Sequence, residues 1–397
     1  MLLSSPMKFI PSFFTLNFLL LCLSSFLFFA SFNMIIPELP AYITSLGGED
    51  YKGLIISLFT LTAGLSRPFS GKLADKIGRI PVMIFGLVVC FIVSLLYPII
   101  TTVAGFLLLR FVHGFSTGFT PTGISAYVAD IVPFNKRGEA MGIQSLFGSL
   151  GMAAGPALGG YIGSAFGINP LFYTASFTAV LSMLVVLRLK ETVEEKEPFR
   201  FNLIKLKRDE IIEKRVLFPS LILFLTVMSF GTVLTIIPDY SEHLGIQNKG
   251  LFFAVFTIAS LGIRIIAGKT SDKYGRVPVM KVASFSMVVA MVIIAFASSK
   301  AILLLGGVIF GASVGMNSPT ISAWTIDLSL DNYRGRALAT MYIALEAGIG
   351  IGAVVSGFLF NNKVENFPLV FLISAVAAFV AFLLLMLQKA QKQTQSS

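Results

Sequence analysis

Long, uninterrupted apolar segments constrain this sequence more than any other feature. Residues 81–100 and 367–388, for example, contain no Asp, Glu, Lys or Arg. A helix that crosses a membrane needs about 20 consecutive apolar residues. Only 13% of the residues are charged, whereas roughly a quarter are charged in a soluble domain. Because the apolar segments also lack the alternation of a membrane barrel, the sequence predicts an all-α integral membrane protein.

Twelve apolar segments are long enough to be predicted as transmembrane helices. A polar stretch with charges of both signs separates the first six from the last six. We expect residues 1–189 to form an N-terminal six-helix bundle, residues 190–216 a cytoplasmic linker, and residues 217–397 a C-terminal six-helix bundle with a short cytoplasmic tail. The predicted helices cover residues 12–36, 53–71, 81–100, 103–130, 139–163, 169–189, 217–240, 250–268, 278–298, 301–327, 336–360 and 367–388.

The basic residues are distributed unequally between the two predicted sides of the membrane. Of the 30 Lys and Arg residues, 25 fall on the side that carries both termini. Cytoplasmic loops are enriched in Lys and Arg, so we expect a multi-pass protein of the inner or plasma membrane of the cell with both termini in the cytoplasm. The net charge of +10 then records topology, and no nucleic-acid partner is expected.

The two halves of the sequence repeat at an offset of 197 residues. Residues 71–79, Gly-Lys-Leu-Ala-Asp-Lys-Ile-Gly-Arg, recur at 268–276 as Gly-Lys-Thr-Ser-Asp-Lys-Tyr-Gly-Arg, and both copies are followed by Pro-Val-Met after one residue. Six predicted spans separate the copies, so both halves have the same orientation in the membrane. The repeat predicts two pseudo-symmetric bundles around a central cavity, which rocking would expose to each side alternately.

These motifs resemble those of the major facilitator superfamily over essentially the whole chain. The motif at residues 71–79 is similar to that superfamily's signature for the loop between helices 2 and 3, although Ile80 stands where a basic residue is common. The glycine-rich motif at residues 151–160 of the fifth predicted helix resembles that of twelve-span drug:proton antiporters. Arg110 and His113 lie in a sequence similar to a proton-coupling motif, with His113 in place of the usual Gln.

The resemblance implies a secondary transporter that exports lipophilic or amphipathic small molecules by alternating access, as multidrug resistance pumps do. Inward proton flow would supply the energy, and no cofactor would be needed. The implied partners are the substrate, protons and the lipid bilayer, and a monomer is the default of the family. A carrier of a sugar, siderophore or other metabolite, acting as exporter or proton symporter, and a lipid flippase are the alternatives.

Two charged clusters are predicted at the cytoplasmic side. Gly71 and Gly78 permit a tight turn around Asp75, and Asp75 and Arg79 can pair if this stretch is helical. The resemblance suggests a conformational latch that holds the cytoplasmic side shut in the outward-open state. The alternative is a loop that anchors helix ends and obeys the positive-inside rule. The remaining predicted latch residues are Asp130, Asp272, Arg276 and Asp327.

The fifth predicted helix carries small residues along one face. Gly151, Gly155 and Gly159 are spaced by four, so they form a smooth stripe, and Gly160 completes the motif. Such stripes let helix backbones approach closely, while Pro156 loosens the helix where it removes a hydrogen bond. Either simple close packing or a sliding contact between the two halves would account for the stripe.

Charged residues inside the predicted spans are the candidates for function, because lipid forces them toward a cavity or a partner. Glu346 lies roughly 15 Å from the helix start at Arg336, near the middle of the membrane, and Ser149 is its counterpart in the repeat. A carboxyl group there can exchange a proton as the cavity opens to either side. The alternative is a structural glutamate that is permanently protonated or held in a salt bridge.

Four further residues complete the predicted cavity and coupling set. Arg110 and His113 could bind an anionic group or relay a proton, although a lone buried histidine is often only hydrogen-bonded. Glu38 and Asp239 follow prolines near the outer ends of helices, where they form either the cavity mouth or an ordinary membrane interface.

An enzymatic activity and a metal site are not expected. The sequence contains no Cys/His metal spacing, phosphate-binding loop or soluble domain that could carry a catalytic set. Cys22 and Cys90 lie inside apolar segments, so we interpret them as small buried residues rather than as a disulfide or a metal pair.

Overall fold

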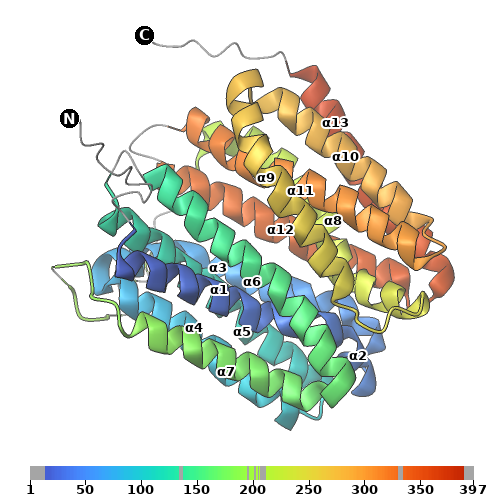
Figure 1. Ribbon diagram of the computed structural model, residues 1–397, viewed down its shortest axis with the longest axis horizontal. Helices are drawn as coiled ribbons and strands as arrows, with labels where there is room; N and C mark the ends of the chain where they lie inside the picture. The colour runs from blue at the N-terminus through green and yellow to red at the C-terminus, as the bar shows by residue number, and fades with distance from the viewer. Residues whose placement is uncertain are drawn as a thin grey trace, which may run out of the picture.

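The computed structural model describes residues 14–133, 137–194, 196–200, 203, 205, 212–329 and 334–388, with only the backbone given for residues 137–139, 265, 269 and 334–336. The described part is helical and contains no strand (Figure 1). Its α-helices are α1 (Leu16–Ile35), α2 (Leu39–Ser45), α3 (Lys52–Ile77), α4 (Arg79–Leu96), α5 (Val103–Ile131), α6 (Arg137–Phe166), α7 (Ile168–Val186), α8 (Leu217–His243), α9 (Leu251–Tyr274), α10 (Arg276–Ala295), α11 (Lys300–Leu328), α12 (Arg334–Phe360) and α13 (Phe367–Leu387).

Nine helices of the described chain are long and apolar enough to cross a membrane, which supports the predicted integral membrane protein. A tenth, α9, meets the same criterion as a pair of segments bent by 41°. The remaining long helices, α3 and α6, are less apolar, because α3 carries several charged side chains and α6 is rich in glycine. Short 3₁₀ helices at Ile36–Glu38, Glu49–Tyr51, Tyr97–Ile99, Lys214–Val216 and Val364–Asn366 lie at helix ends.

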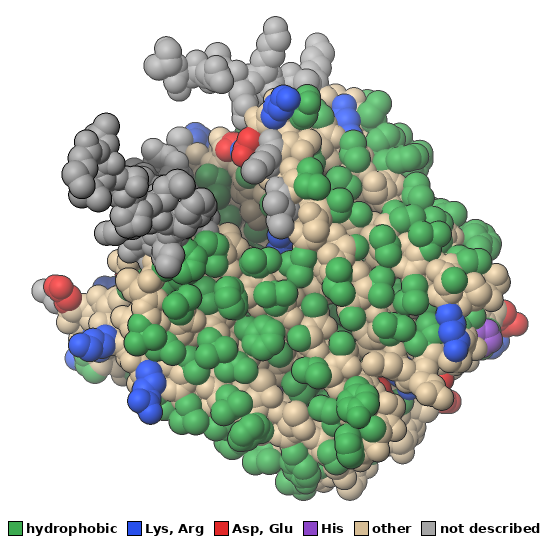
Figure 2. All heavy atoms as spheres, viewed as in Figure 1, with side chains coloured by type: hydrophobic (Ala, Val, Ile, Leu, Met, Phe, Trp, Pro, Cys, Tyr) green, Lys and Arg blue, Asp and Glu red, His purple; other side chains and the backbone are tan. Residues whose placement is uncertain are grey.

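The surface agrees with a lipid environment. Apolar side chains cover the middle of the face in Figure 2, and the Lys, Arg, Asp and Glu side chains lie toward its rims. Phe358 and Leu387 are each 82% exposed. An apolar surface of this extent is unfavourable in water, where large exposed patches mark interaction sites. Cys22 and Cys90 are free and buried, as expected from their apolar segments.

Helix α3 continues beyond the predicted end at residue 71. It reaches Ile77, and only Gly78 separates it from Arg79 at the start of α4. Gly78 has a φ of +115°, which glycine adopts without steric cost. Gly275, with a φ of +91°, makes the equivalent turn between α9 and α10. Gly71 lies within α3 and takes no part in the turn.

Helix contacts fall into two sets with a repeated pattern. In the first set, α1 packs on α6 and α7, α3 on α5, and α4 on α5 and α7. In the second set, α8 packs on α12 and α13, α9 on α11, and α10 on α11 and α13. The main contacts between the sets are α3 with α12 and α6 with α9. Because α9 and α12 are the repeat counterparts of α3 and α6, these two contacts are equivalent under the sequence repeat.

The glycine stripe of α6 packs against α1. A Cβ atom at Gly151, Gly155 or Gly159 would lie 2.3, 2.7 or 1.8 Å from the nearest carbonyl oxygen of α1. The opposite side of the motif meets the second set of helices. A Cβ atom at Gly160 would lie 2.1 Å from Asn248 Oδ1, and one at Gly250 would lie 1.8 Å from the Pro156 carbonyl oxygen. Close packing within one set and a close contact between the sets thus occur on different faces of α6.

We expect Gly159→Ala to destabilise the protein by about 1–3 kcal/mol, because the added methyl group must displace the Met34 backbone. Thermal or denaturant unfolding of the detergent-solubilised protein measures this loss. Gly142→Ala is the matched control on the same helix, since nothing lies within 4 Å of its Cβ position, and it should leave stability unchanged or raise it by up to about 1 kcal/mol. Equal stabilities of the two variants would contradict the packing argument.

Candidate functional site

A cavity of about 340 Å³ lies between the two sets of helices. Binding sites for drug-sized molecules have volumes of roughly 300–1,000 Å³. Helices α1, α5 and α6 of the first set and α8 to α12 of the second contribute to its wall, so its shape depends on how the two sets are placed. The residues that line it include Phe29, Pro121, Ser125, Gln144, Ser145, Ser149, Met152, Thr226, Phe230, Phe256, Thr257, Ser260, Arg264, Met287, Asn317, Ser318, Ser322, Met341, Tyr342, Leu345 and Ile349.

The cavity wall combines apolar surface with many neutral polar groups. Its aromatic and methionine side chains offer adaptable apolar contacts, and its serine, threonine and amide side chains offer hydrogen bonds. Among the described residues that line it, Arg264 carries the only formal charge. Such a wall suits an amphipathic organic molecule.

Glu346 forms a buried ion pair that joins the two sets of helices. Its Oε1 atom lies 2.8 Å from Nη2 of Arg67, so α12 is linked to α3. The Arg67 guanidinium also lies over the Tyr342 ring, 4.6 Å from its centroid. Glu346 is thus ion-paired in this conformation. Sequence reasoning singled out Glu346 but not Arg67, although Arg67 lies four residues before the predicted end of its helix and therefore inside a span.

The repeat counterpart of this ion pair contains no acid. Arg264 of α9 occupies the position of Arg67 in the second half, and Ser149 of α6 occupies that of Glu346. Nη1 of Arg264 donates a hydrogen bond of 2.9 Å to Ser149 Oγ. The same geometry therefore joins α6 to α9 through a neutral partner.

Two further ion pairs join the sets at the end of the molecule opposite to the start of α1. Lys52 Nζ lies 3.0 Å from Asp239 Oδ2, and Lys249 Nζ lies 4.0 Å from Glu38 Oε2. Lys249 also lies 2.7 Å from Glu242. Lys52 and Lys249 are repeat counterparts at the offset of 197 residues. Glu38 and Asp239 correspond through the motifs Ile-Ile-Pro-Glu and Ile-Ile-Pro-Asp, at an offset of 201, so each half supplies one cation and one anion. The sequence identified both acids as candidates but gave no role to the lysines.

Arg110 and His113 are buried and hydrogen-bonded within the first set of helices. Arg110 Nε donates to the Ile55 carbonyl oxygen at 2.8 Å, and its guanidinium lies over the Phe59 ring. The ring nitrogens of His113 lie 3.2 Å from the Tyr97 hydroxyl and 3.4 Å from Cys90 Sγ. Neither residue lines the cavity described above. This polar cluster links α3, α4 and α5 within the first set.

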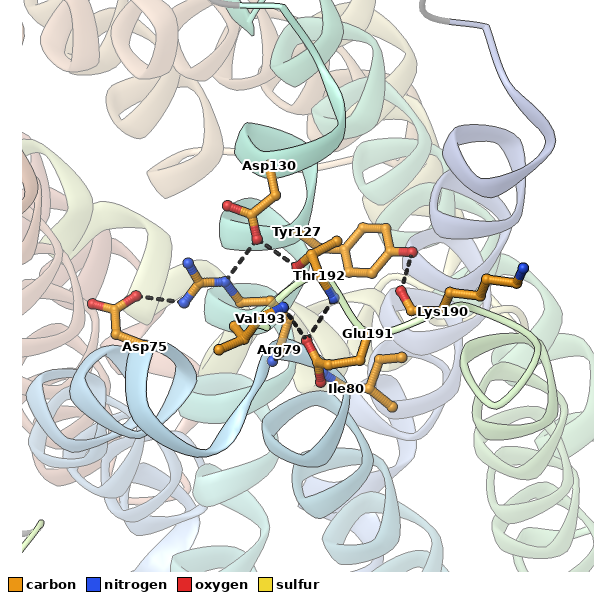
Figure 3. A network of polar contacts seen from close by, with 9 residues as sticks. All are labelled: Asp75, Arg79, Ile80, Tyr127, Asp130, Lys190, Glu191, Thr192 and Val193. Carbon is orange, nitrogen blue, oxygen red and sulfur yellow. Dashed lines mark hydrogen bonds and ion pairs between the residues drawn. The ribbon is translucent and has the colours of Figure 1, made fainter. Parts of the chain in front are cut away.

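The predicted latch residues form two equivalent clusters near the start of α1. In the first, Arg79 pairs with Asp75, and its Nε atom lies 3.0 Å from Asp130 Oδ2 (Figure 3). Each pair joins helices of the first set, namely α3, α4 and α5. The helical continuation of α3 through Asp75 places the two side chains four residues apart, as the sequence anticipated.

The second cluster reproduces the first. Arg276 pairs with Asp272, and its Nε atom lies 2.9 Å from Asp327 Oδ2. These contacts join α9, α10 and α11. In this conformation the arginine of each cluster therefore pairs with acids of its own set of helices.

Glu191, which follows α7, caps the N-terminus of α4 next to the first cluster. Its carboxylate accepts hydrogen bonds from the backbone N–H groups of Arg79 at 3.0 Å and Ile80 at 3.1 Å (Figure 3). An anion at a helix N-terminus is stabilised by the unpaired N–H groups and the helix dipole. Sequence reasoning missed this role because Glu191 lies 112 residues from Arg79 and within a segment of mixed charge.

Comparison with known proteins identifies the relatives of this chain. The family model described as Major Facilitator Superfamily matches residues 21–247 and 219–397. The multi-drug resistance efflux pump PmrA of Streptococcus pneumoniae serotype 4 is 29% identical over 314 residues, which cover 75% of this chain and 78% of PmrA. Multidrug resistance protein 2 of Bacillus subtilis is 30% identical over 274 residues, which cover 65% and 67% of the two chains.

A solved structure shares the fold. The crystal structure of a D-xylose-proton symporter superposes with a TM-score of 0.77, covering 93% of this chain and 96% of the symporter at 16% sequence identity. The similarity supports the helical arrangement described above.

We expect Arg67 and Glu346 to be energetically coupled. Arg67→Gln or Glu346→Gln alone leaves a buried charge without its partner and should lower the unfolding free energy by about 3–5 kcal/mol. The double variant should lose clearly less than the sum of the two. Unfolding in detergent measures the coupling, and the exposed pair Lys76 and Glu197 provides a control cycle with an expected value of about 0–1 kcal/mol. Additive losses for Arg67 and Glu346 would contradict this prediction.

Proposed function

Because the chain belongs to the major facilitator superfamily and is a transporter rather than an enzyme, we propose that it exports lipophilic or amphipathic small molecules in exchange for protons. The observation that carries this proposal is the cavity between the two sets of helices, whose wall offers aromatic, methionine and hydroxyl side chains from both. The relative named as a multi-drug resistance efflux pump supports the direction of transport, and the relative named as a multidrug resistance protein supports the class of substrate. The transport cycle would need no cofactor.

The proposed architecture is a pair of pseudo-symmetric six-helix bundles around the cavity. Helix α1 and helices α3 to α7 would span the membrane in the first bundle, within residues 1–189, and helices α8 to α13 in the second, within residues 217–397. The linker at 190–216 and both termini would lie in the cytoplasm of a monomer in the cell membrane. The sequence repeat and the excess of Lys and Arg on one side support this arrangement.

The contacts between the bundles support an inward-facing conformation. At the proposed outer end, Lys52 pairs with Asp239 and Lys249 approaches Glu38, and both contacts cross between the bundles. At the proposed cytoplasmic end, the charged clusters of Arg79 and Arg276 stay within their own bundles. Rocking of the bundles would separate the outer pairs and bring the two cytoplasmic clusters together as the latch.

Glu346 is the proposed proton-coupling residue. Its pairing with Arg67 links the two bundles, so protonation of the carboxylate would remove one side of that link and favour rearrangement. Arg110 and His113 form a second candidate element, because a buried arginine next to a hydrogen-bonded histidine can hold or relay a proton. Both elements lie apart from the cavity wall, which would separate proton transfer from substrate binding.

A lipid flippase is the second candidate function, and one observation favours it. An apolar groove of about 760 Å³ lies between α3 and α12, and Glu346 is among its lining residues. A groove of this kind could admit an acyl chain from the bilayer. Translocation of a fluorescently labelled phospholipid in proteoliposomes would support the flippase, whereas its absence alongside active dye efflux supports the exporter.

We expect cells that express the protein to export at least one member of a panel of lipophilic dyes of different charge until a protonophore collapses the proton gradient. Glu346→Gln should lower proton-driven efflux at least tenfold, because the neutral amide cannot release a proton. Glu365→Gln, an exposed substitution of the same type, should leave efflux unchanged. Efflux that persists without a proton gradient, or unchanged efflux by Glu346→Gln, would refute proton antiport.

We expect loss of the outer ion pairs to shift the protein toward the outward-facing conformation. The Lys52–Asp239 pair is largely buried, and a loss of only about 1 kcal/mol there would change the population ratio roughly fivefold. Asp239→Asn should produce this shift. The double variant Lys52→Asp and Asp239→Lys exchanges the two charges and so retains an ion pair, and its populations should be close to those of the wild-type protein. Distances between spin labels on the two bundles report the populations. An unchanged distribution in Asp239→Asn would show that the pair does not hold the outer side closed.

A further inference from the structure

Arg264 has an incomplete set of partners in the wall of the central cavity. Its Nη1 atom donates to Ser149 Oγ, and its buried Nε atom has no hydrogen-bond partner. No acidic residue of the described chain lies within ion-pair distance of its guanidinium group, although that group carries five N–H donors. Arg67, its repeat counterpart, also has a buried Nε atom without a hydrogen-bond partner, so the missing acid is what sets Arg264 apart. Its charge lines the cavity with one neutral partner.

The repeat supplies an internal comparison for this site. Arg67, the counterpart of Arg264, is neutralised by Glu346 and stacked on Tyr342. Ser149 stands where Glu346 would be, so Arg264 receives one neutral hydrogen bond in place of an ionic one. A charge without a partner at this depth costs several kcal/mol. Arg110 is likewise buried on neutral partners alone, but Arg264 lines an open cavity, where a bound anion would offset the cost of its charge.

The surroundings of Arg264 can accommodate a polar group. Ser260 lies one helical turn before Arg264 on α9, and Thr257 lies about one turn further, and all three line the cavity. Asn317 also lines it, donates a 2.7 Å hydrogen bond to Thr226, and keeps its Oδ1 atom unpaired. Neutral hydrogen-bonding groups next to a guanidinium group suit an oxyanion and its substituents.

The rest of the cavity wall suits an apolar group. Phe230 and Phe256 pack edge to face at a centroid distance of 5.9 Å, and Met287 and Met341 also line the cavity. A molecule bound here would thus meet one cation and a largely apolar surface. The volume of about 340 Å³ fits a compound of one or two rings.

We propose that Arg264 binds the anionic group of the transported substrate, and that the substrates are amphipathic organic anions with a carboxylate or sulfonate beside an aromatic body. The inference rests on the proposed transport function and narrows its substrate class. Arginine is suited to this task because its planar fork can bind both oxygens of such a group. Glu346 and Arg67 would remain outside the binding step, since neither lines this cavity.

Fluorescence binding to the purified, detergent-solubilised full chain tests this proposal. Dansylglycine and its carboxamide differ only in the anionic group, and the environment-sensitive dansyl ring reports entry into the cavity. The wild-type protein should bind dansylglycine at least tenfold more tightly than the carboxamide. Arg264→Gln should bind the two compounds equally, while Arg264→Lys should restore part of the preference, because a lysine retains the charge without the fork.

Lys300→Gln is the control for the loss of one positive charge, because Lys300 is exposed at the start of α11. This variant should still bind dansylglycine more tightly than the carboxamide. Equal binding of the two compounds by the wild-type protein would overturn the proposal. So would a preference that persists in Arg264→Gln. If that variant does not fold, the wild-type comparison alone decides. Selective binding without proton-driven efflux would refute the exporter but leave the anion site standing, so the two failures are distinguishable.

Discussion

A charge inside a membrane protein needs a partner, and the contacts between the two sets of helices follow this constraint. Arg67 pairs with Glu346 between α3 and α12. Lys52 pairs with Asp239 near the end of the molecule that lies opposite to the start of α1. Each of these pairs takes one member from each set of helices. Because separating a buried pair leaves two unpartnered charges, the relative placement of the sets is tied to the protonation and pairing of a few side chains.

The sequence repeat makes the exceptions to this pairing informative. The pairs at the end of the molecule opposite to the start of α1 are reciprocal, with Lys52 and Lys249 each approaching an acid of the other half. The central pair is not, because Ser149 replaces the acid opposite Arg264. Equivalent positions of the repeat thus hold two different arginines: Arg67, paired with an acid of the other set of helices, and Arg264, which lines the cavity. The proposed separation of proton coupling from substrate binding depends on this difference.

Backbone proximity completes the contact between the sets. On one face of α6 the glycine stripe fits α1, and on another Gly160 and Pro156 meet the segment before α9. Glycine permits such approach because it has no Cβ atom. A contact of this type carries no charge and makes few directional bonds, so in the proposed transport cycle it would separate without breaking an ion pair.

Much of this organisation could be predicted from residue order alone. Apolar length predicted the helices, the offset of 197 residues predicted equivalent halves, and the spacing of Asp75 and Arg79 predicted their pairing, because these properties depend on neighbours along the chain. The sequence also identified Glu346 as a buried acid. It did not identify Arg67 as its partner, Lys52 as the partner of Asp239, or Glu191 as the cap of α4. Those contacts join residues that lie 112 to 279 positions apart in the sequence. Only the packing of the helices determines which of these distant charges form ion pairs, and it leaves Arg264 without an acidic partner in the described part of the chain.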